Sequence, residues 1–251
     1  MLSRVLPPLA LFALLFAAWE GYCRLSGVSE LVLPGPSAVL RALYIHREAI
    51  GGHALATLLV AVPGFALSVS FAVLTSVALH FYPRAERAVL PVFVASQTVP
   101  LVALAPLMIL WFGFGLLPKI LLVILVTFFP VLLSLLSGYR QTPAAFRDLL
   151  RSMGAGRRQI FLRATWPSAR GAFFAGLRIS ATYAIVATIF AEYAGARQGI
   201  GIWILAAKNS FRADLVLAAV LVSALLTLGL LGALRAIEAL SARGPARRHH
   251  A

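Results

Sequence analysis

The sequence contains very little charge, and acidic residues are especially scarce. Only 12% of its 251 residues are charged and 61% are hydrophobic, whereas soluble domains average about 25% charged and about 45–50% apolar residues. Its eight acids are scattered, so no acidic pair indicates a metal site. These proportions predict an integral membrane protein in contact with membrane lipid.

Cysteine and catalytic motifs are also nearly absent. The single Cys23 excludes an intrachain disulfide and a cysteine metal cluster. There is no P-loop, so the chain is not expected to hydrolyse ATP itself. The H-E-x-x-H and G-x-S-x-G signatures are missing too. We therefore expect a protein that is not an enzyme and has no cofactor or metal of its own.

What the sequence does contain is an excess of arginine, with a formal net charge of +14. Such a charge also occurs in proteins that bind nucleic acid. In a chain this apolar, however, arginines that flank membrane segments are explained by the tendency of basic residues to remain on the cytoplasmic side. We expect no nucleic-acid partner.

Six apolar stretches are long enough to cross a bilayer core, which takes about 20 residues. They cover about residues 5–25, 53–79, 88–111, 116–136, 173–193 and 215–237. Arg4 before the first stretch would also suit a signal peptide, but no convincing cleavage site follows. The predicted fold is all-α, with six transmembrane helices in a single domain over residues 1–251.

Several local features refine this prediction. Pro63 and Gly64 interrupt the second span, and residues 38–44 suggest a short surface helix with Ser37 as a possible cap. The fifth span contains small residues suited to close helix packing, namely Ala175, Gly176, Ser180, Ala181 and Ala184. A glycine-containing loop is expected over residues 194–213.

The distribution of basic residues predicts the orientation. If both termini are cytoplasmic, 15 of the 22 lysines and arginines lie inside and 7 lie outside. The inner set includes seven arginines between residues 140 and 170. This bias predicts a multi-pass protein with both termini and the 140–170 interval in the cytoplasm.

The 140–170 interval is polar but carries the signals of folded structure. Thr142 suits a helix N-cap, and Pro143 suits the first helical position. Residues 144–153 read as about three helical turns, ending before Gly154, where a left-handed residue is favoured. A second short helix then leads toward Pro167. A compact helix–turn–helix on one membrane face is suited to docking another protein.

Polar residues within the spans indicate where a cavity or a functional group would lie. Gln97 and Thr98 precede Pro100 in the proline-rich third span, and Glu192 ends the fifth. Prolines in membrane helices release backbone carbonyls and often occur beside cavities, while intramembrane ionisable residues are functional candidates. The alternatives are packing kinks at the prolines and an interfacial Glu192 that is paired with an arginine or hydrogen-bonded to a loop amide.

The polar interval resembles the cytoplasmic loop of permease subunits from bacterial binding-protein-dependent ABC importers, whose pattern is E-A-A-x3-G-x9-I-x-L-P. Asp148, Leu149 and Leu150 fall on E-A-A, Gly154 on the glycine and Pro167 on the final proline. The chain departs from the pattern where leucines replace both alanines, and where Ala164 and Trp166 replace the isoleucine and leucine. The resemblance implies that an ATPase docks on this loop, with Met153 and Ala155 flanking the glycine in the contact.

Further segments extend the resemblance to nearly the whole chain. LPGPSAVLRAL, TVPLVALAPLMILWFGFG and GLRISATYAIVATIFAEYAGARQGIGIWI resemble ordered segments of nitrate-, sulfonate- and taurine-type permeases. Their residue patterns are most similar to those of permeases for the pyrimidine precursor of thiamine. Permeases of riboflavin-type importers are also similar.

The resemblance implies a permease of the bacterial inner membrane. Its expected partners are cytoplasmic ATPase subunits that bind the ATP, a periplasmic solute-binding protein, and a second copy of the permease. Nitrate, taurine and alkanesulfonates are alternative solutes. A secondary transporter that needs no ATPase and an integral-membrane enzyme are the alternative classes.

Overall fold

The computed structural model describes residues 2–242, which are helical without strands. Four of its helices are long and apolar enough to cross a membrane, namely α3 (Arg47–Phe81), α6 (Leu116–Arg140), α10 (Arg170–Tyr193) and α12 (Ala213–Ala242). The bent pair α4 (Pro83–Ser96) and α5 (Leu101–Phe112) makes a fifth crossing if it counts as one. The expected all-helical membrane fold is confirmed, while the count of six spans and the orientation stay predictions.

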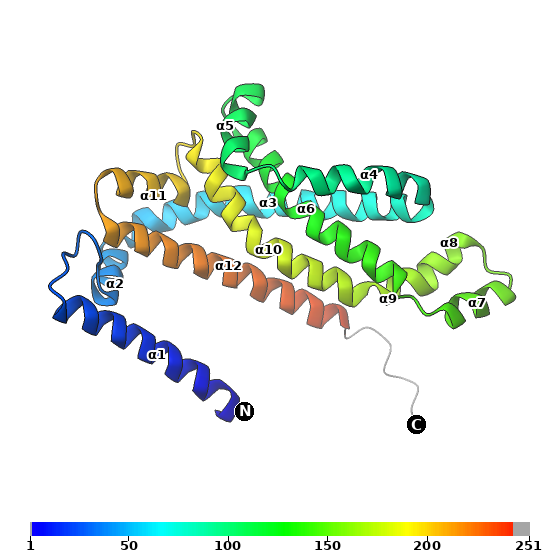
Figure 1. The fold of residues 1–251 in the computed structure, drawn as a ribbon, viewed down its shortest axis with the longest axis horizontal. Helices are drawn as coiled ribbons and strands as arrows, with labels where there is room; N and C mark the ends of the chain where they lie inside the picture. Colours follow the sequence, from blue (N-terminus) through cyan, green and yellow to red (C-terminus); the bar gives the residue numbers. More distant parts are fainter. Residues whose placement is uncertain (1, 243–251) are drawn as a thin grey trace.

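Helices α3, α6 and α10 form the centre of an elongated bundle (Figure 1). The core side chains Val131, Leu132 and Leu135 of α6 are completely buried. At Gly176, an added Cβ would lie 2.7 Å from the Cβ of Ser134, so α10 approaches α6 too closely for a larger residue. Small residues permit such close packing where lipid provides no hydrophobic drive.

Buried hydroxyl groups tie the same helices together. The Ser180 hydroxyl donates to the carbonyl of Thr127 at 2.6 Å, and the Thr127 hydroxyl donates to Ser68 Oγ at 2.7 Å. The predicted packing role of the small residues in the fifth span is confirmed for Gly176, Ser180, Ala181 and Ala184, which are all buried, while Ala175 is half-buried.

Helix α3 corrects the prediction that Pro63 and Gly64 interrupt the second span. The helix continues through both residues for 35 residues. A proline is tolerated inside a membrane helix where neighbouring groups accommodate the freed carbonyl. Gly64 is required for packing instead, because a Cβ there would lie 2.9 Å from Val123 of α6.

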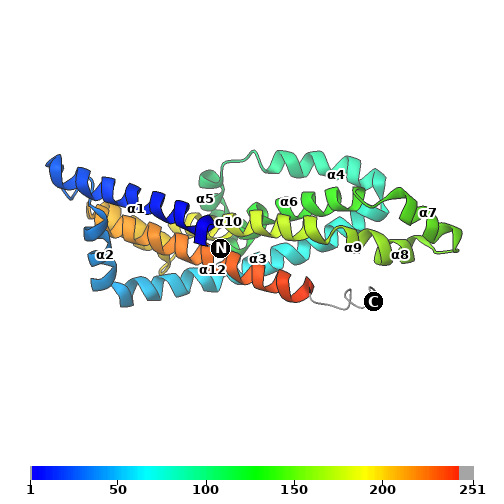
Figure 2. The same cartoon turned by 90° about the horizontal axis from the view of Figure 1, so that it is seen from below.

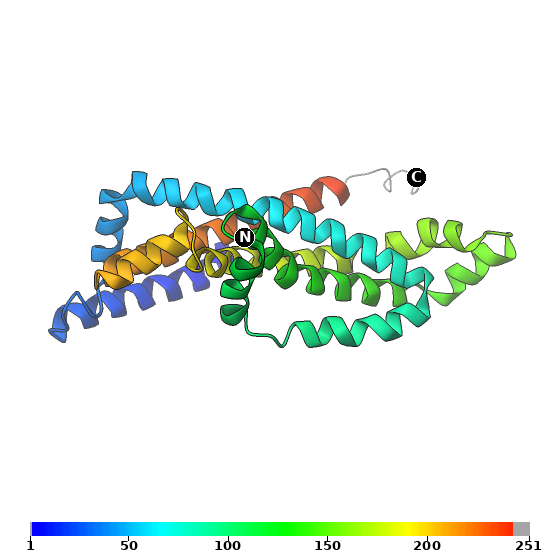
Figure 3. The same ribbon diagram turned by 90° about the horizontal axis from the view of Figure 1, so that it is seen from above.

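The predicted third span is broken rather than continuous. Helix α4 runs back along α3, and α5 turns away at 100° after residues 97–100 (Figure 3). Pro100 lacks the N–H that would continue the helical ladder, and its backbone is extended with ψ at 125°. Pro100 therefore ends one helix and opens the next.

The expected loop over residues 194–213 contains a helix, α11 (Ile200–Asn209). With ten residues it is too short to cross a membrane. It packs against α3, α10 and α12, and its Ile200 lies in a cluster with Ile50, Ala218, Ala219 and Val39 of α2 (Pro36–Ile45) (Figure 1). The prediction of a loop was wrong, because this segment forms α11 between two turns and buries Ile200, Gly201 and Ala207.

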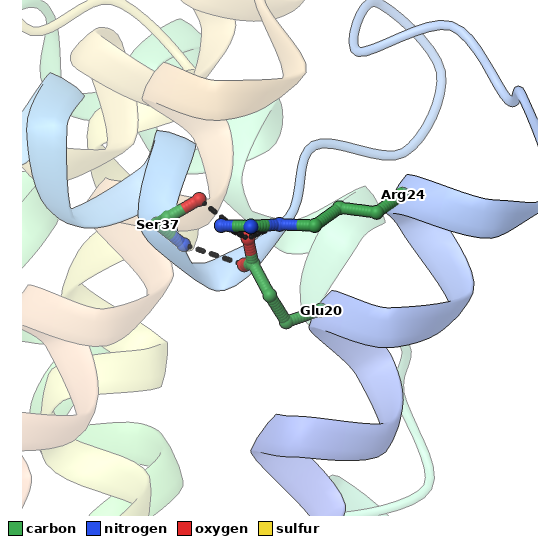
Figure 4. A network of polar contacts seen from close by, with 3 residues as sticks. All are labelled: Glu20, Arg24 and Ser37. Carbon is green, nitrogen blue, oxygen red and sulfur yellow. Dashed lines mark hydrogen bonds and ion pairs between the residues drawn. The ribbon is translucent and has the colours of Figure 1, made fainter.

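Helix α1 (Leu2–Leu25) corresponds to the first predicted span and contacts the remaining protein mainly through α2 (Figure 2). Glu20 makes that connection, because its carboxylate accepts hydrogen bonds from the Ser37 backbone N–H at 3.0 Å and from Ser37 Oγ at 2.8 Å (Figure 4). Arg24 pairs with the same carboxylate. The predicted Ser37 cap is wrong, since Gly35 occupies the N-cap and Glu20 binds the free N–H.

Candidate functional site

A short helix with an exposed apolar side lies at one end of the bundle. Helix α7 (Ala144–Ser152) follows α6, and α8 (Arg157–Ile160) runs back from it (Figure 1). Leu150 packs inward against Ile160 and Ala164. Leu149 is 56% exposed and Met153 is 73% exposed, and Phe146 is exposed beside them. We call these three residues the α7 apolar surface.

The glycine after α7 has the backbone that the sequence predicts. Gly154 has a φ of +80°, and the N–H of Ala155 donates to the Leu150 carbonyl at 2.9 Å. This six-to-one bond is the Schellman arrangement that closes a helix with a left-handed residue. Asp148 is exposed and pairs only loosely with Arg151, at 3.3 Å.

Thr142 does not cap α7 as expected. Pro143 is the N-cap, with an extended backbone of ψ 130°, and the Thr142 hydroxyl donates to the Tyr139 carbonyl at 2.9 Å. A residue before proline is disfavoured in the helical region. Thr142 therefore closes α6 instead of opening α7.

Beyond α8 the chain returns to the bundle through a π-helical turn, η1 (Phe161–Thr165), and α9 (Trp166–Ser168). Phe161 is buried among the rings of His80, Phe81, Tyr139 and Trp166, with centroids 5.0–6.2 Å apart. Pro167 is exposed in α9. These aromatic contacts join the α7–α8 region to the ends of α3 and α6.

The α4–α5 break borders a cavity of about 460 Å³ against α6 and α10. Gln97 lines this cavity, and its side-chain amide donates to the Leu125 carbonyl of α6 at 3.2 Å. Thr98 is exposed, but its hydroxyl donates locally to the Ala95 carbonyl at 2.8 Å. The sequence-predicted polar residues of this span thus lie at the break, and Gln97 faces the cavity.

Glu192, near the end of α10, does not line that cavity and is only 1% exposed. One carboxylate oxygen accepts a hydrogen bond from the Thr57 hydroxyl at 2.8 Å. The other accepts from the Gly201 N–H at 2.7 Å. Glu192 therefore binds the first turn of α11 and holds it against α3. This arrangement matches the alternative of a loop-amide bond that the sequence left open.

Two further residues complete this cluster, which we call the Glu192 latch and define as His53, Thr57, Glu192, Gly199 and Gly201. The Ile200 N–H donates to Thr57 Oγ1 at 2.8 Å, and the Gly199 N–H donates to His53 Nδ1 at 3.0 Å. A carboxylate is favourable at a helix N-terminus because the exposed N–H groups carry partial positive charge. Sequence reasoning missed His53 and Thr57.

The two glycines of the latch, Gly199 and Gly201, have no room for a side chain. A Cβ on Gly199 would lie 2.2 Å from the Glu192 carboxyl carbon, and a Cβ on Gly201 would lie 2.4 Å from the Ile189 carbonyl oxygen. The G-x-G pattern at 199–201 is the sequence signal that marks this close approach.

Comparison with known proteins agrees with this architecture. Residues 64–241 match the family described as binding-protein-dependent transport system inner membrane component. A formylaminopyrimidine transport permease protein of Halalkalibacterium halodurans is 35% identical over 91% of both chains.

Two other relatives have different named solutes. A riboflavin transport system permease protein of Chloroflexus aurantiacus is 33% identical over 86% of this chain and 82% of the relative. A taurine transport system permease protein of Escherichia coli is 30% identical over 90% and 85%. With its family match, its length coverage and its apolar helices, the chain belongs to the family of inner-membrane permease components of binding-protein-dependent ABC transport systems.

Proposed function

We propose that this protein is the membrane-spanning subunit of an ATP-driven importer, and that it forms the pathway for a small solute delivered by a periplasmic binding protein. The α7 apolar surface carries the proposal. Exposed Leu149 and Met153 sit on a helix that the Gly154 turn closes, at the end of the bundle rich in arginine. Such a helix is suited to a groove in a soluble partner, which we take to be the ATPase that binds ATP.

Movement of the docked helix would reach the membrane through rigid contacts. Leu150 joins α7 to Ile160 and Ala164, and Phe161 joins the following turn to the aromatic rings of α3 and α6. Packed cores transmit displacement because they deform little. We take the ATPase contact to cover Asp148 to Ala155, where Leu149 and Met153 are exposed and Leu150 anchors the helix from beneath, with exposed Pro167 at the far end of the loop.

The pathway is proposed to pass the α4–α5 break. The cavity there exposes Gln97, with Thr98 and Pro100 in the adjoining turn. Two copies of the chain would enclose the route between them. Glu192 would stabilise its outer mouth, because its latch holds α11 in place.

For the solute, we propose a thiamine pyrimidine precursor or a related vitamin precursor. The formylaminopyrimidine and riboflavin relatives support this proposal. Nitrate, taurine and alkanesulfonates are the alternative, supported by the taurine relative. Binding measurements on the cognate periplasmic protein would distinguish them, and uptake without any ATPase would indicate a secondary transporter instead.

The docking proposal is tested with Leu149→Glu. A carboxylate in the middle of an apolar contact is costly to bury, by about 2 kcal/mol or more, so co-purification with the ATPase should fall at least about tenfold. Leu31→Glu, at a similarly exposed leucine in the connection between α1 and α2, is the matched control. Undiminished co-purification of Leu149→Glu would refute docking at α7.

A further inference from the structure

A second cavity, separate from the one at the α4–α5 break, has a larger volume. It measures about 1130 Å³ and is bounded by α3, by the turn that leads into α6 and by the turn between α10 and α11. Leu59 and Phe114 contribute apolar walls, whereas Lys119, Arg197 and Gln198 contribute polar groups. Ligand pockets typically combine apolar walls with a few polar groups in this way.

The two cations in this cavity have no acidic partner among the residues described. The five ion pairs among the described residues all involve side chains other than Lys119 and Arg197. Glu192 is close enough to Lys119 to interact with it electrostatically. Its carboxylate is nevertheless 1% exposed, and its two oxygens accept from Thr57 and Gly201. The accessible lining therefore carries positive charge only.

The turn that carries Arg197 has a fixed backbone conformation. Gly195 and Gly199 flank Arg197 with φ values of +132° and +133°, which side chains with a Cβ rarely adopt. A Cβ on Gly195 would lie 2.5 Å from the ring of Phe114, so the turn and the α6 entry are packed against each other. This contact fixes the turn that carries Arg197 beside the helix that carries Lys119.

The placement of the cations runs against the general charge bias of the chain. Under the proposed orientation this cavity opens on the outer side, where only 7 of the 22 basic residues lie. A concave site with one sign of charge and apolar walls concentrates the field and raises the local concentration of counter-ions. Resting on the proposed importer role, and on the anionic alternatives for its solute, we propose that this cavity is an entry vestibule that attracts the oxyanion group of an incoming solute, a sulfonate, carboxylate or phosphate, through Lys119 and Arg197.

A carboxylate on the binding protein would have the same chemistry as a solute oxyanion. The small solute is favoured because the cations line a concave cavity together with apolar side chains, instead of projecting from a flat rim. The experiment below treats contact with the binding protein as a separate outcome.

The vestibule is tested by placing a thiol inside it and measuring the local potential. Gln198→Cys in a Cys23→Ala background is treated with 2-sulfonatoethyl methanethiosulfonate or its trimethylammonium counterpart, each rate being normalised to that with glutathione. We expect the anionic reagent to react about fivefold faster or more. Lys119→Gln and Arg197→Gln, singly and together, should reduce this preference. Lys208→Gln, which removes an exposed cation outside the cavity, should leave it unchanged.

The solute is represented by methanesulfonate, with uncharged dimethyl sulfone as its isosteric control. Millimolar methanesulfonate should slow labelling in the parent but not in the double glutamine variant, and dimethyl sulfone should have no effect. Equal rates for the two reagents, or protection that survives the double variant, would overturn the proposal. Protection by the cognate binding protein but not by methanesulfonate would also overturn it. Labelling needs only the inserted chain, so failure of ATPase coupling would leave this result interpretable.

Discussion

At the scale of single residues, the Glu192 latch shows how one acid can join three helices. Its two oxygens bind Thr57 of α3 and the Gly201 N–H of α11. The sequence indicated that Glu192 was unusual, and it offered a loop-amide bond as one explanation. It gave no means to find Thr57, because 135 residues separate the two partners. Such pairing depends on how α3 and α10 pack, which a single sequence does not reveal.

Gly199→Ala tests the latch directly. The new Cβ would overlap the Glu192 carboxyl group, and the φ of +133° would strain any residue other than glycine. Left-handed strain of about 1–2 kcal/mol and a displaced buried hydrogen bond of about 1–3 kcal/mol should together lower stability by about 2–5 kcal/mol. Thermal unfolding of the detergent-purified protein measures this loss.

Gly171→Ala is the matched control, because Gly171 lies in α10 like Glu192 and has no atom within 4 Å of the added Cβ. Alanine in a helix should be neutral or stabilising by up to about 1 kcal/mol. If the two alanine variants unfold at the same temperature, the close packing of Gly199 against the Glu192 carboxyl group does not stabilise the protein.

At the scale of elements, the short helices α2 and α11 are both capped at the N-terminus by an acidic side chain from a long helix. Glu20 of α1 binds the first turn of α2, and Glu192 of α10 binds the first turn of α11 (Figure 4). Neither helix has a side-chain cap of its own. The acids satisfy exposed N–H groups that would otherwise remain unpaired beside the membrane.

Predictions from the sequence succeeded for elements with strong periodic or apolar signals. The apolar runs predicted α3, α6, α10 and α12, and the glycine turn predicted the end of α7. The α4–α5 bend and α11 were missed for different reasons. Pro100 was expected to kink a span, yet its direction change of 100° depends on packing against α6 and α10. The flanking glycines made α11 resemble a loop.

Gly154→Val should uncouple transport without preventing insertion. The position has free space but a φ of +80°, so valine strains the turn instead of clashing. That strain, about 1–3 kcal/mol, should unwind the Schellman closure and displace Met153. We expect solute uptake to be lost while the amount of inserted protein is maintained. Gly156→Val is the control, since Gly156 has equal space and an ordinary φ of −74°. Normal uptake by Gly154→Val would count against α7 as the coupling element.

The α4–α5 break makes a separate prediction about the pathway. In a Cys23→Ala background, Gln97→Cys should react with small water-soluble thiol reagents during the ATPase cycle, because Gln97 lines the adjoining cavity. Modification should block uptake while the complex remains assembled. Ser180→Cys, completely buried in the helix core, should stay unreactive. Resistance of Gln97→Cys throughout the cycle would leave Gln97 with a structural role only, as the donor to the Leu125 carbonyl.

At the scale of the whole molecule, the broken span decides the orientation of everything that follows it. Helix α4 has 14 residues and α5 has 12, so at 1.5 Å per residue each is only about 18–21 Å long. Neither crosses a core of about 30 Å alone. If the pair crosses once, α6 delivers the arginine-rich 140–170 segment to the same side as the termini. If the pair re-enters and returns, that segment and its seven arginines lie outside.

Cysteine labelling separates these two topologies. In a Cys23→Ala background, Gln141→Cys should be labelled only from the cytoplasm and Gln198→Cys only from outside. Both positions are exposed, and α10 runs between them toward opposite ends of the bundle (Figure 1). A re-entrant α4–α5 pair would reverse both results while leaving α1 and α3 in place. The reversed pattern would place seven arginines against the positive-inside tendency and would remove α7 from reach of a cytoplasmic ATPase. The expected pattern therefore requires α4 and α5 to cross the membrane together as one span.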